Sequence, residues 1–203
     1  MILLDFSQTM IGSFMAMGKG SIVVEEDLLR HTVLNSIRQY KHQFRHVDHG
    51  GFVICCDSPK NWRKESFPEY KANRKKRRET DSTDWTSLFE FLHQMIADLR
   101  EYFPYKVMRV ERAEADDIIA SIIKLQEEDI YLIVSGDKDF IQLHHYGNVY
   151  QWSPLLKGFI GEQEDPKRFL KEQIIKGDRS DGVPNILSAD DVFVKGERQK
   201  PIK

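Results

Sequence analysis

Short apolar runs alternate with longer stretches of helical periodicity, and this alternation limits the possible folds more than any other feature. The apolar runs are too short for helices, so we interpret them as buried strands. The predicted strands are Ile2–Phe6, Gly51–Cys56, Tyr105–Val110, Ile130–Val134 and Val149–Trp152. The predicted helices are Leu28–Phe44, Asp84–Phe103, Glu114–Leu125 and one that Asp165-Pro166 opens, with Phe169, Leu170, Ile174 and Ile175 inward. This pattern is typical of an α/β domain with a mostly parallel sheet.

One segment carries a strong positive charge. Between Lys60 and Arg78 there are nine Lys or Arg and two Glu, a net charge of +7, while the whole chain carries −2. We expect this segment to be irregular or mobile. A basic segment on an acidic body is typical of a phosphate-binding element beside a metal site. For the run from Lys75 to Arg78, a solvated charged surface remains an equal alternative.

Acidic residues follow four of the predicted strands and the last predicted helix. They are Asp5, Asp57, the group Glu114, Asp116 and Asp117, the pair Asp137 and Asp139, and the pair Asp178 and Asp181. The carboxyl ends of parallel strands meet at one edge of a sheet, so the first four groups should converge there. Carboxylates packed so closely repel one another unless a cation lies between them. Oxygen ligands favour Mg²⁺ or Mn²⁺ over zinc, and the seven His show no metal-ligand spacing.

The cysteines and the hydropathy limit the compartment. Cys55 and Cys56 are neighbours inside an apolar run, so they cannot form a disulfide framework, and a reducing cytoplasm fits. No apolar run approaches the roughly 18 residues of a membrane helix. We therefore expect no contact with a membrane and a cytoplasmic location.

The acidic positions stand within recognisable motifs. These are Leu4-Asp5-Phe6-Ser7, the strand-ending Asp57, Glu114-Ala115-Asp116-Asp117, Ser135-Gly136-Asp137-Lys138-Asp139-Phe140 and Gly177-Asp178-Arg179-Ser180-Asp181-Gly182-Val183-Pro184. In that order they resemble the acidic motifs of the flap-endonuclease/5′-3′ exonuclease family of the PIN-like superfamily. Within it the chain is most similar to the tailed-phage ribonuclease H type. Two further motifs of that type are Gln151-Trp152-Ser153-Pro154 and Lys195-Gly196-Glu197-Arg198.

The resemblance implies a role for each matching position. The first Mg²⁺ would be held by Asp5, Asp57, Asp116 and Asp137, with Glu114 and Asp117 adjoining. The second would be held by Asp139, Asp178 and Asp181, and Mn²⁺ would substitute for either ion. Pro68 to Arg74 resembles the start of the family's arch, in which Lys71 and Arg74 would contact the scissile phosphate. The further nucleic-acid-binding residues would be Trp62, Arg63, Tyr70, Lys75, Lys76, Arg77 and Arg78.

The resemblance also implies domains and a function. We expect a PIN-like, resolvase-like nuclease domain over residues 1–164, with the arch at about 58–83. Residues 165–203 would be the start of a helix-hairpin, duplex-binding region that is shorter than in the family. The implied activity is that of a Mg²⁺-dependent 5′-3′ exonuclease and flap endonuclease with ribonuclease H activity on RNA primers, RNA–DNA hybrids and 5′ flaps. Implied partners are a replication single-strand-binding protein or sliding clamp, and we expect a monomer in the cytoplasm of a bacterial host.

Two alternatives stay open at this point. A truncated, non-catalytic nucleic-acid-binding remnant would explain the short C-terminal region, although it would gain nothing from crowded acids near phosphate. An endoribonuclease of the PIN type would share the strand-end acids. Such enzymes usually lack the arch and the Gly-Asp-x-x-Asp element that this chain carries.

Overall fold

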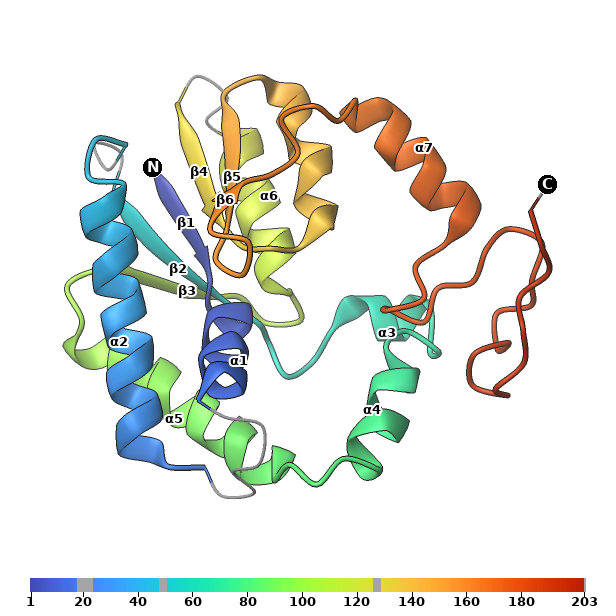
Figure 1. Cartoon of the computed structure of the whole chain (residues 1–203), viewed down its shortest axis with the longest axis horizontal. Helices are drawn as coiled ribbons and strands as arrows, with labels where there is room; N and C mark the ends of the chain where they lie inside the picture. The colour runs from blue at the N-terminus through green and yellow to red at the C-terminus, as the bar shows by residue number, and fades with distance from the viewer. Residues whose placement is uncertain (18–23, 48–50, 126–128, 203) are drawn as a thin grey trace.

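The computed structural model describes residues 1–17, 24–47, 51–125 and 129–202, and it describes only the backbone of residues 76 and 77. Six strands form one sheet in the order β3-β2-β1-β4-β5-β6 (Figure 1). The parallel strands are β1 (Ile2–Asp5), β2 (Phe52–Cys56), β3 (Lys106–Arg109), β4 (Tyr131–Val134) and β5 (Val149–Ser153). The short strand β6 (Gly158–Phe159) runs antiparallel to β5. The predicted α/β class and mostly parallel sheet are confirmed.

Helices cover both faces of the sheet. One face packs against α1 (Phe6–Ala16), α2 (Glu26–Gln43) and α5 (Trp85–Tyr102), and the other against α6 (Ala115–Leu125) and the 3₁₀ helix η2 (Lys138–Tyr146). Alternate strand residues serve the two layers: Leu4 and Ile54 lie in the first core, whereas Leu3 and Val53 lie in the second. Burial on both faces explains why the strands are continuous apolar runs.

Helix α1 follows β1 without a loop and was not predicted. Asp5 ends the strand and also caps the helix, because its carboxylate accepts a hydrogen bond from the backbone N–H of Gln8 at 3.1 Å. The helix is rich in Ser, Thr and Gly, which are poor helix formers. Burial of Phe6, Met10 and Phe14 against the first core stabilises it instead.

The basic segment is helical, which corrects the expectation of an irregular stretch. It forms α3 (Trp62–Ser66) and α4 (Ala72–Glu79), which stand across a gap from the sheet (Figure 1). The sequence of α4 has no apolar face, so hydrophobic periodicity gave no sign of it. Arg, Lys, Ala and Glu nevertheless have high helix propensity, and the helix base is tied to another segment described below.

The inward orientation predicted for Leu170, Ile174 and Ile175 of the last helix is wrong, whereas Phe169 is partly buried. Helix α7 (Pro166–Lys176) has no buried residue, and Leu170, Ile174 and Ile175 are 41%, 62% and 42% exposed. Periodicity places these apolar residues together, but it cannot supply a partner for them. The helix packs on η2, and there the Gln173 amide donates a hydrogen bond to Asp139 at 3.2 Å.

Two further expectations concern the cysteines and the membrane. Cys55 and Cys56 are buried free thiols in β2, as predicted. Burial raises the pKa of both thiols, so they stay protonated at neutral pH. Among the helices that the structure describes, none is both long and apolar enough to cross a membrane.

Candidate active site

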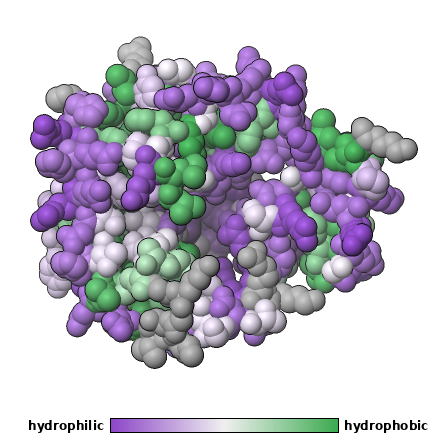
Figure 2. All heavy atoms as spheres, viewed as in Figure 1, coloured by the Kyte–Doolittle hydropathy of each residue, from purple (hydrophilic) through white to green (hydrophobic). Residues whose placement is uncertain are grey.

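The acidic residues of the strand ends meet at one edge of the sheet. In the parallel register, Asp5 of β1 lies beside Cys55 of β2, and Leu4 lies beside Val134 of β4. The carboxylates that follow these strands therefore share this edge. They line a groove of about 1300 Å³, seen as a hollow in Figure 2, together with basic residues of the arch. The groove-lining residues used below are Asp5, Asp57, Glu114, Asp116, Asp137, Lys71, Arg74 and Arg78.

Asp5 is the most buried of these acids. Its carboxylate accepts hydrogen bonds from the backbone of Gln8 and from the Ser135 hydroxyl, both at 3.1 Å. Burial raises the pKa of Asp5 to about 7; the charges of Asp57 and Asp137 also raise it, while the two hydrogen bonds lower it. Asp5 thus lacks a compensating positive charge.

Asp116 has the same difficulty on the neighbouring element. It lies in the first turn of α6, and burial raises its pKa to about 8, with the charges of Asp5 and Asp137 as the next causes. Lys71 lowers the pKa of Asp116 only in part. Three carboxylates from three different elements therefore act on one another through a poorly solvated space.

A second group of acids adjoins the first. Burial raises the pKa of Asp139 to about 6, and the charges of Asp137, Asp178 and Asp181 contribute to the rise. Asp178 and Asp181 come from the turn after α7, so the structure brings together the three residues predicted as the second cluster. Asp137 lies between the groups, where its carboxylate caps η2 by accepting the Asp139 N–H at 3.0 Å.

The residues fit a hard divalent cation by their chemistry. The charged groups that could serve as metal ligands at this edge are carboxylates, and carboxylate oxygens are the ligands that Mg²⁺ and Mn²⁺ prefer. The raised pKa values of Asp5, Asp116 and Asp139 show where positive charge is needed. No three His, Cys, Asp or Glu in the described ranges form a ready-made ligand group. The edge is therefore a cluster of separate carboxylates that a cation would draw together.

Glu114 pairs with the arch. The Lys71 ammonium donates to it at 2.7 Å, and the Tyr70 hydroxyl lies 2.8 Å from Glu114 and 2.9 Å from Asp181. One hydroxyl proton serves one carboxylate at a time, so Tyr70 links the two acidic groups. Burial raises the pKa of Glu114, but Lys71 and Tyr70 bring it below its ordinary value. Tyr70 is only 7% exposed, so its ring is not available for the nucleic-acid contact predicted for it.

The turn that carries Asp181 docks on the base of the arch. The Lys71 backbone N–H donates to the Asp181 carbonyl at 2.7 Å, and the Arg74 guanidinium pairs with the Asp181 carboxylate. Gly182 permits this approach: its φ is +76°, and a Cβ there would lie 3.1 Å from the Glu69 carbonyl oxygen. The two predicted phosphate-contacting residues, Lys71 and Arg74, are thus held at the acidic edge.

Asp117 has a different surrounding from its neighbour Asp116. Its two carboxylate oxygens accept bidentate hydrogen bonds from the Arg63 guanidinium at 2.8 and 2.9 Å. One of these oxygens also accepts the Glu114 N–H at 2.9 Å. Burial raises the pKa of Asp117, but Arg63 brings it below its ordinary value. Asp117 therefore positions Arg63 and the start of α6, and Trp62 also donates to it at 3.2 Å.

The other basic residues of the arch differ in their surroundings. Lys75 is exposed, and the side chains predicted at Lys76 and Arg77 lie outside the described part. The Arg78 guanidinium lies 4.7 Å from the Phe89 ring centroid and 5.3 Å from that of Trp85, while it also lines the groove. Burial lowers the pKa of Arg78. Its guanidinium stays charged, because so basic a group remains protonated at neutral pH.

Two supporting residues were missed as site components. The Gln151 amide donates to the carbonyls of Ser135 at 2.9 Å and Asp137 at 2.6 Å, which fixes the loop after β4. On the other side, the side-chain carbonyl of Gln8 accepts the Gly136 N–H and lies 3.1 Å from the Ser135 hydroxyl. The available signal was a polar residue at an inward position of β5, between the buried Val149 and Ser153.

Comparisons with known proteins identify the family of this chain. The model of the 5′-3′ exonuclease N-terminal resolvase-like domain matches residues 1–176. Ribonuclease H of Enterobacteria phage T4 is 35% identical over 210 residues, which cover 99% of this chain and 68% of that protein. The 5′-3′ exonuclease of Buchnera aphidicola subsp. Schizaphis graminum is 33% identical over 142 residues, covering 66% of this chain and 47% of that one. The chain thus spans about half the length of this second relative.

A solved structure has the same fold. The D15 flap endonuclease of bacteriophage T5, in a pseudo-enzyme–product complex with DNA and metal ions, superposes with a TM-score of 0.71 at 20% identity. The superposition covers 91% of this chain and 69% of that one. The predicted family and the resolvase-like fold are confirmed. The chain belongs to the family of 5′-3′ exonucleases and flap endonucleases, which are nucleases.

Proposed function

We propose that this protein is a Mg²⁺-dependent 5′-3′ exonuclease and flap endonuclease with ribonuclease H activity, which removes RNA primers and 5′ ends during replication. One observation carries the proposal. Carboxylates from three strand ends face the Lys71 and Arg74 side of the arch across one groove, in a member of this nuclease family. The name of the phage T4 relative, ribonuclease H, supports RNA–DNA hybrids as a substrate class.

The two acidic groups would hold the metal ions. The first group is Asp5, Asp57, Asp116 and Asp137, and the second is Asp139, Asp178 and Asp181. Mg²⁺ supplies, when bound, a water of lowered pKa and stabilisation of the charge that develops during in-line displacement. The T5 flap endonuclease, solved with DNA and metal ions, supports both the cofactor class and the nucleic-acid substrate.

The chain's own residues would bind and orient the phosphate. Lys71 and Arg74 are the cations next to the carboxylates, and each has hydrogen-bond donors suited to phosphate oxygens. In the structure Lys71 pairs with Glu114 and Asp181, and Arg74 pairs with Asp181. A phosphate entering the groove would replace these carboxylates as the partner of Lys71 and Arg74. Tyr70 and Arg63 position the acids and do not line the groove.

Cleavage assays with a matched pair of variants test the proposal. The substrates are a 5′-flap duplex and an RNA–DNA hybrid, labelled at either end, with Mg²⁺, Mn²⁺ or EDTA. Asp137→Asn removes one charge but keeps an acceptor for the η2 cap, and Asp165→Asn does the same at the α7 cap, away from the groove. We expect metal-dependent 5′-3′ products from the wild type and from Asp165→Asn, and none from Asp137→Asn.

Other outcomes would replace the proposal. Binding without cleavage by the wild type would indicate the non-catalytic remnant. Internal cleavage of single-stranded RNA alone would indicate the endoribonuclease activity. Recruitment by a single-strand-binding protein or clamp and the monomeric state stay predictions, which pull-down with purified proteins and light scattering would test.

A further inference from the structure

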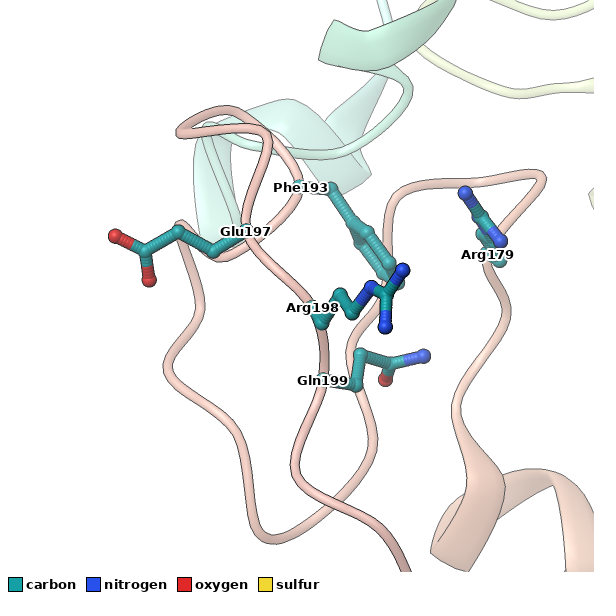
Figure 3. Close-up of a pocket in the computed structure, with 5 residues that line it drawn as sticks. All are labelled: Arg179, Phe193, Glu197, Arg198 and Gln199. Atoms are coloured by element: carbon teal, nitrogen blue, oxygen red, sulfur yellow. The ribbon is translucent and has the colours of Figure 1, made fainter.

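A buried polar pair adjoins the loop that carries Asp137. His144 belongs to the 3₁₀ helix η2 and Gln151 to strand β5, and neither lines the catalytic groove. Neither lines the smaller cavity of about 370 Å³ in the C-terminal segment, whose walls are Arg179, Phe193, Glu197, Arg198 and Gln199 (Figure 3). The chemistry proposed above leaves His144 without a role.

The amide nitrogen of Gln151 fixes the orientation of this side chain. It donates to the backbone carbonyls of Ser135 at 2.9 Å and Asp137 at 2.6 Å. A flipped amide would turn its oxygen toward these two carbonyl oxygens and would lose both hydrogen bonds. The Gln151 oxygen therefore points away from the Asp137 loop, in a residue that is only 1% exposed.

The Gln151 oxygen lies near the imidazole of His144. Gln151 Oε1 and His144 Nε2 are both buried, and neither has a direct hydrogen-bond partner among the described residues. Burial lowers the pKa of His144, while hydrogen bonding to the Gly161 backbone and to the Gln151 side chain opposes this in part. The two side chains are therefore neighbours, and their contact stands at the limit of hydrogen-bond geometry. A slight rotation would satisfy both buried atoms.

Close packing holds the His144 ring in this place. Gly161 has a φ of +80°, and a Cβ there would lie 2.5 Å from His144 Cε1 and 2.9 Å from Nδ1. The Nδ1 side of the ring thus faces Gly161, which leaves Nε2 for Gln151. A side chain at Gly161 would displace the imidazole, so the glycine is required here.

One proton has two possible acceptors. The lowered pKa keeps His144 neutral at pH 8, and a neutral imidazole has one N–H. A hydrogen bond that raises an imidazole pKa is one that the ring donates, so Gly161 offers its carbonyl oxygen. That oxygen already accepts the Glu164 N–H at 3.1 Å, whereas Gln151 Oε1 has no other partner in the described ranges. A buried acceptor without a donor is costly, so the proton belongs on Nε2.

We propose that His144 is a positioning residue for Asp137: it donates its Nε2–H to the Gln151 oxygen and thereby keeps the Gln151 amide on the Asp137 loop. The inference rests on the proposed function, because the place of Asp137 matters for cleavage only if Asp137 is a metal ligand. Without the donor, the Gln151 amide can turn and release the carbonyls of Ser135 and Asp137. His144 touches neither the substrate nor the reacting atoms.

Two variants of similar size separate the two ring nitrogens. Glutamine places its amide nitrogen near the former Nε2, and asparagine places it near the former Nδ1. His144→Gln should therefore keep the bond to Gln151, whereas His144→Asn should keep only the bond to Gly161. His145→Asn is the control, because His145 is the exposed neighbour in the same helix.

Nuclear magnetic resonance in EDTA at pH 8 measures the pair without cleavage. The signals are those of the His144 ring nitrogens and of the Gln151 side-chain NH₂ group. We expect the protonated nitrogen of the wild type to be Nε2. The Gln151 NH₂ protons should exchange with water about 10-fold faster in His144→Asn, and at the wild-type rate in His144→Gln and in the control.

Cleavage of a flap substrate with Mg²⁺ measures the effect on Asp137. His144→Asn should lower kcat about 10-fold at an unchanged KM and should raise the Mg²⁺ concentration that gives the half-maximal rate, because partners that orient a metal ligand contribute effects of this size. His144→Gln and His145→Asn should keep the wild-type values. General destabilisation would instead affect His144→Gln and His144→Asn alike.

Each other result overturns a defined part. A proton on Nδ1, or Gln151 signals that His144→Asn leaves unchanged, would refute the positioning role even if the wild type cleaves. Rescue by asparagine and not by glutamine would refute it too, because the Gly161 contact would then be the one that matters. Faster Gln151 exchange with wild-type kinetics would refute the link to Asp137. The expected signals in a wild type that never cleaves would sustain the His144–Gln151 bond and refute the proposed function instead.

Discussion

Replacing Asp5 by Asn should stabilise the metal-free protein at alkaline pH. The surroundings accept an amide: its oxygen keeps the hydrogen bond from the Gln8 N–H, and its nitrogen donates to the Ser135 hydroxyl oxygen. The Ser135 hydroxyl then donates to Gln8, which lies at 3.1 Å. Asn is also as good a helix N-cap as Asp, so α1 keeps its start. The substitution therefore removes a charge and little else.

The magnitude follows from the raised pKa of Asp5. A pKa raised from 3.8 to about 7 means that the folded state binds the proton more tightly than the unfolded state. Stability is therefore highest at low pH and falls as the pH rises from about 4 to 7. Ionisation of Asp5 lowers the free energy of unfolding by about 4 kcal/mol in total, and about 3 kcal/mol of this loss occurs between pH 5 and pH 8. The free energy of unfolding of Asp5→Asn minus that of the wild type should therefore be about 3 kcal/mol greater at pH 8 than at pH 5.

Urea unfolding in EDTA at the two pH values measures this difference directly. Asp84→Asn serves as the control, because Asp84 also caps a helix, is exposed, and has a pKa lowered by its hydrogen bonds to Ser87. The control should show no gain at pH 8. An Asp5→Asn effect that is the same at both pH values would refute the reasoning, because it would mean that the buried carboxylate is already compensated.

Three further results are expected. Adding Mg²⁺ at pH 8 should raise the melting temperature of the wild type more than that of Asp5→Asn, because an ion that binds more tightly stabilises the fold more, and EDTA should reverse the rise. Equal shifts of the two melting temperatures would contradict a metal site at this edge. Gly182→Ala should lower the free energy of unfolding by about 1–2 kcal/mol, because alanine is strained at a φ of +76° and its Cβ would crowd the Glu69 carbonyl. Urea unfolding measures this change, and Gly147→Ala is the control, because Gly147 also has a positive φ but has open space around its Cβ position. Tyr70→Phe should lower the cleavage rate about 10-fold, because it keeps the ring but loses the hydroxyl between Glu114 and Asp181. Wild-type kinetics would show that this hydroxyl is not needed for cleavage.

The sheet and its acidic edge could be predicted because both follow from local patterns. Apolar runs such as Phe52–Cys56 are long enough for one buried strand, and parallel strands bring their carboxyl ends together. The conflict among Asp5, Asp116 and Asp137 was therefore expected from chain order alone, and the raised pKa values agree with it.

Features that depend on tertiary partners could not be predicted. The sequence of α4 shows no apolar face, and its place is set by the contact of Lys71 and Arg74 with a turn more than 100 residues away. The sequence also does not show that Asp117 pairs with Arg63 while Asp116 lies among other carboxylates, because this difference depends on where Arg63 lies in the fold. The exposed Leu170 of α7 shows the reverse case, a periodic apolar side without a described partner.

The docking of the Asp181 turn on the arch has a mechanical consequence. The backbone bond from Lys71 to Asp181, the bond from Asn73 to Arg179 and the bond from Arg74 to Ser180 join α4 to this turn. The base of the arch and the turn are therefore mechanically coupled, so that a displacement of α4 would also displace Asp181. In the proposed nuclease, a substrate contact that displaces α4 would therefore also shift a member of the second carboxylate group.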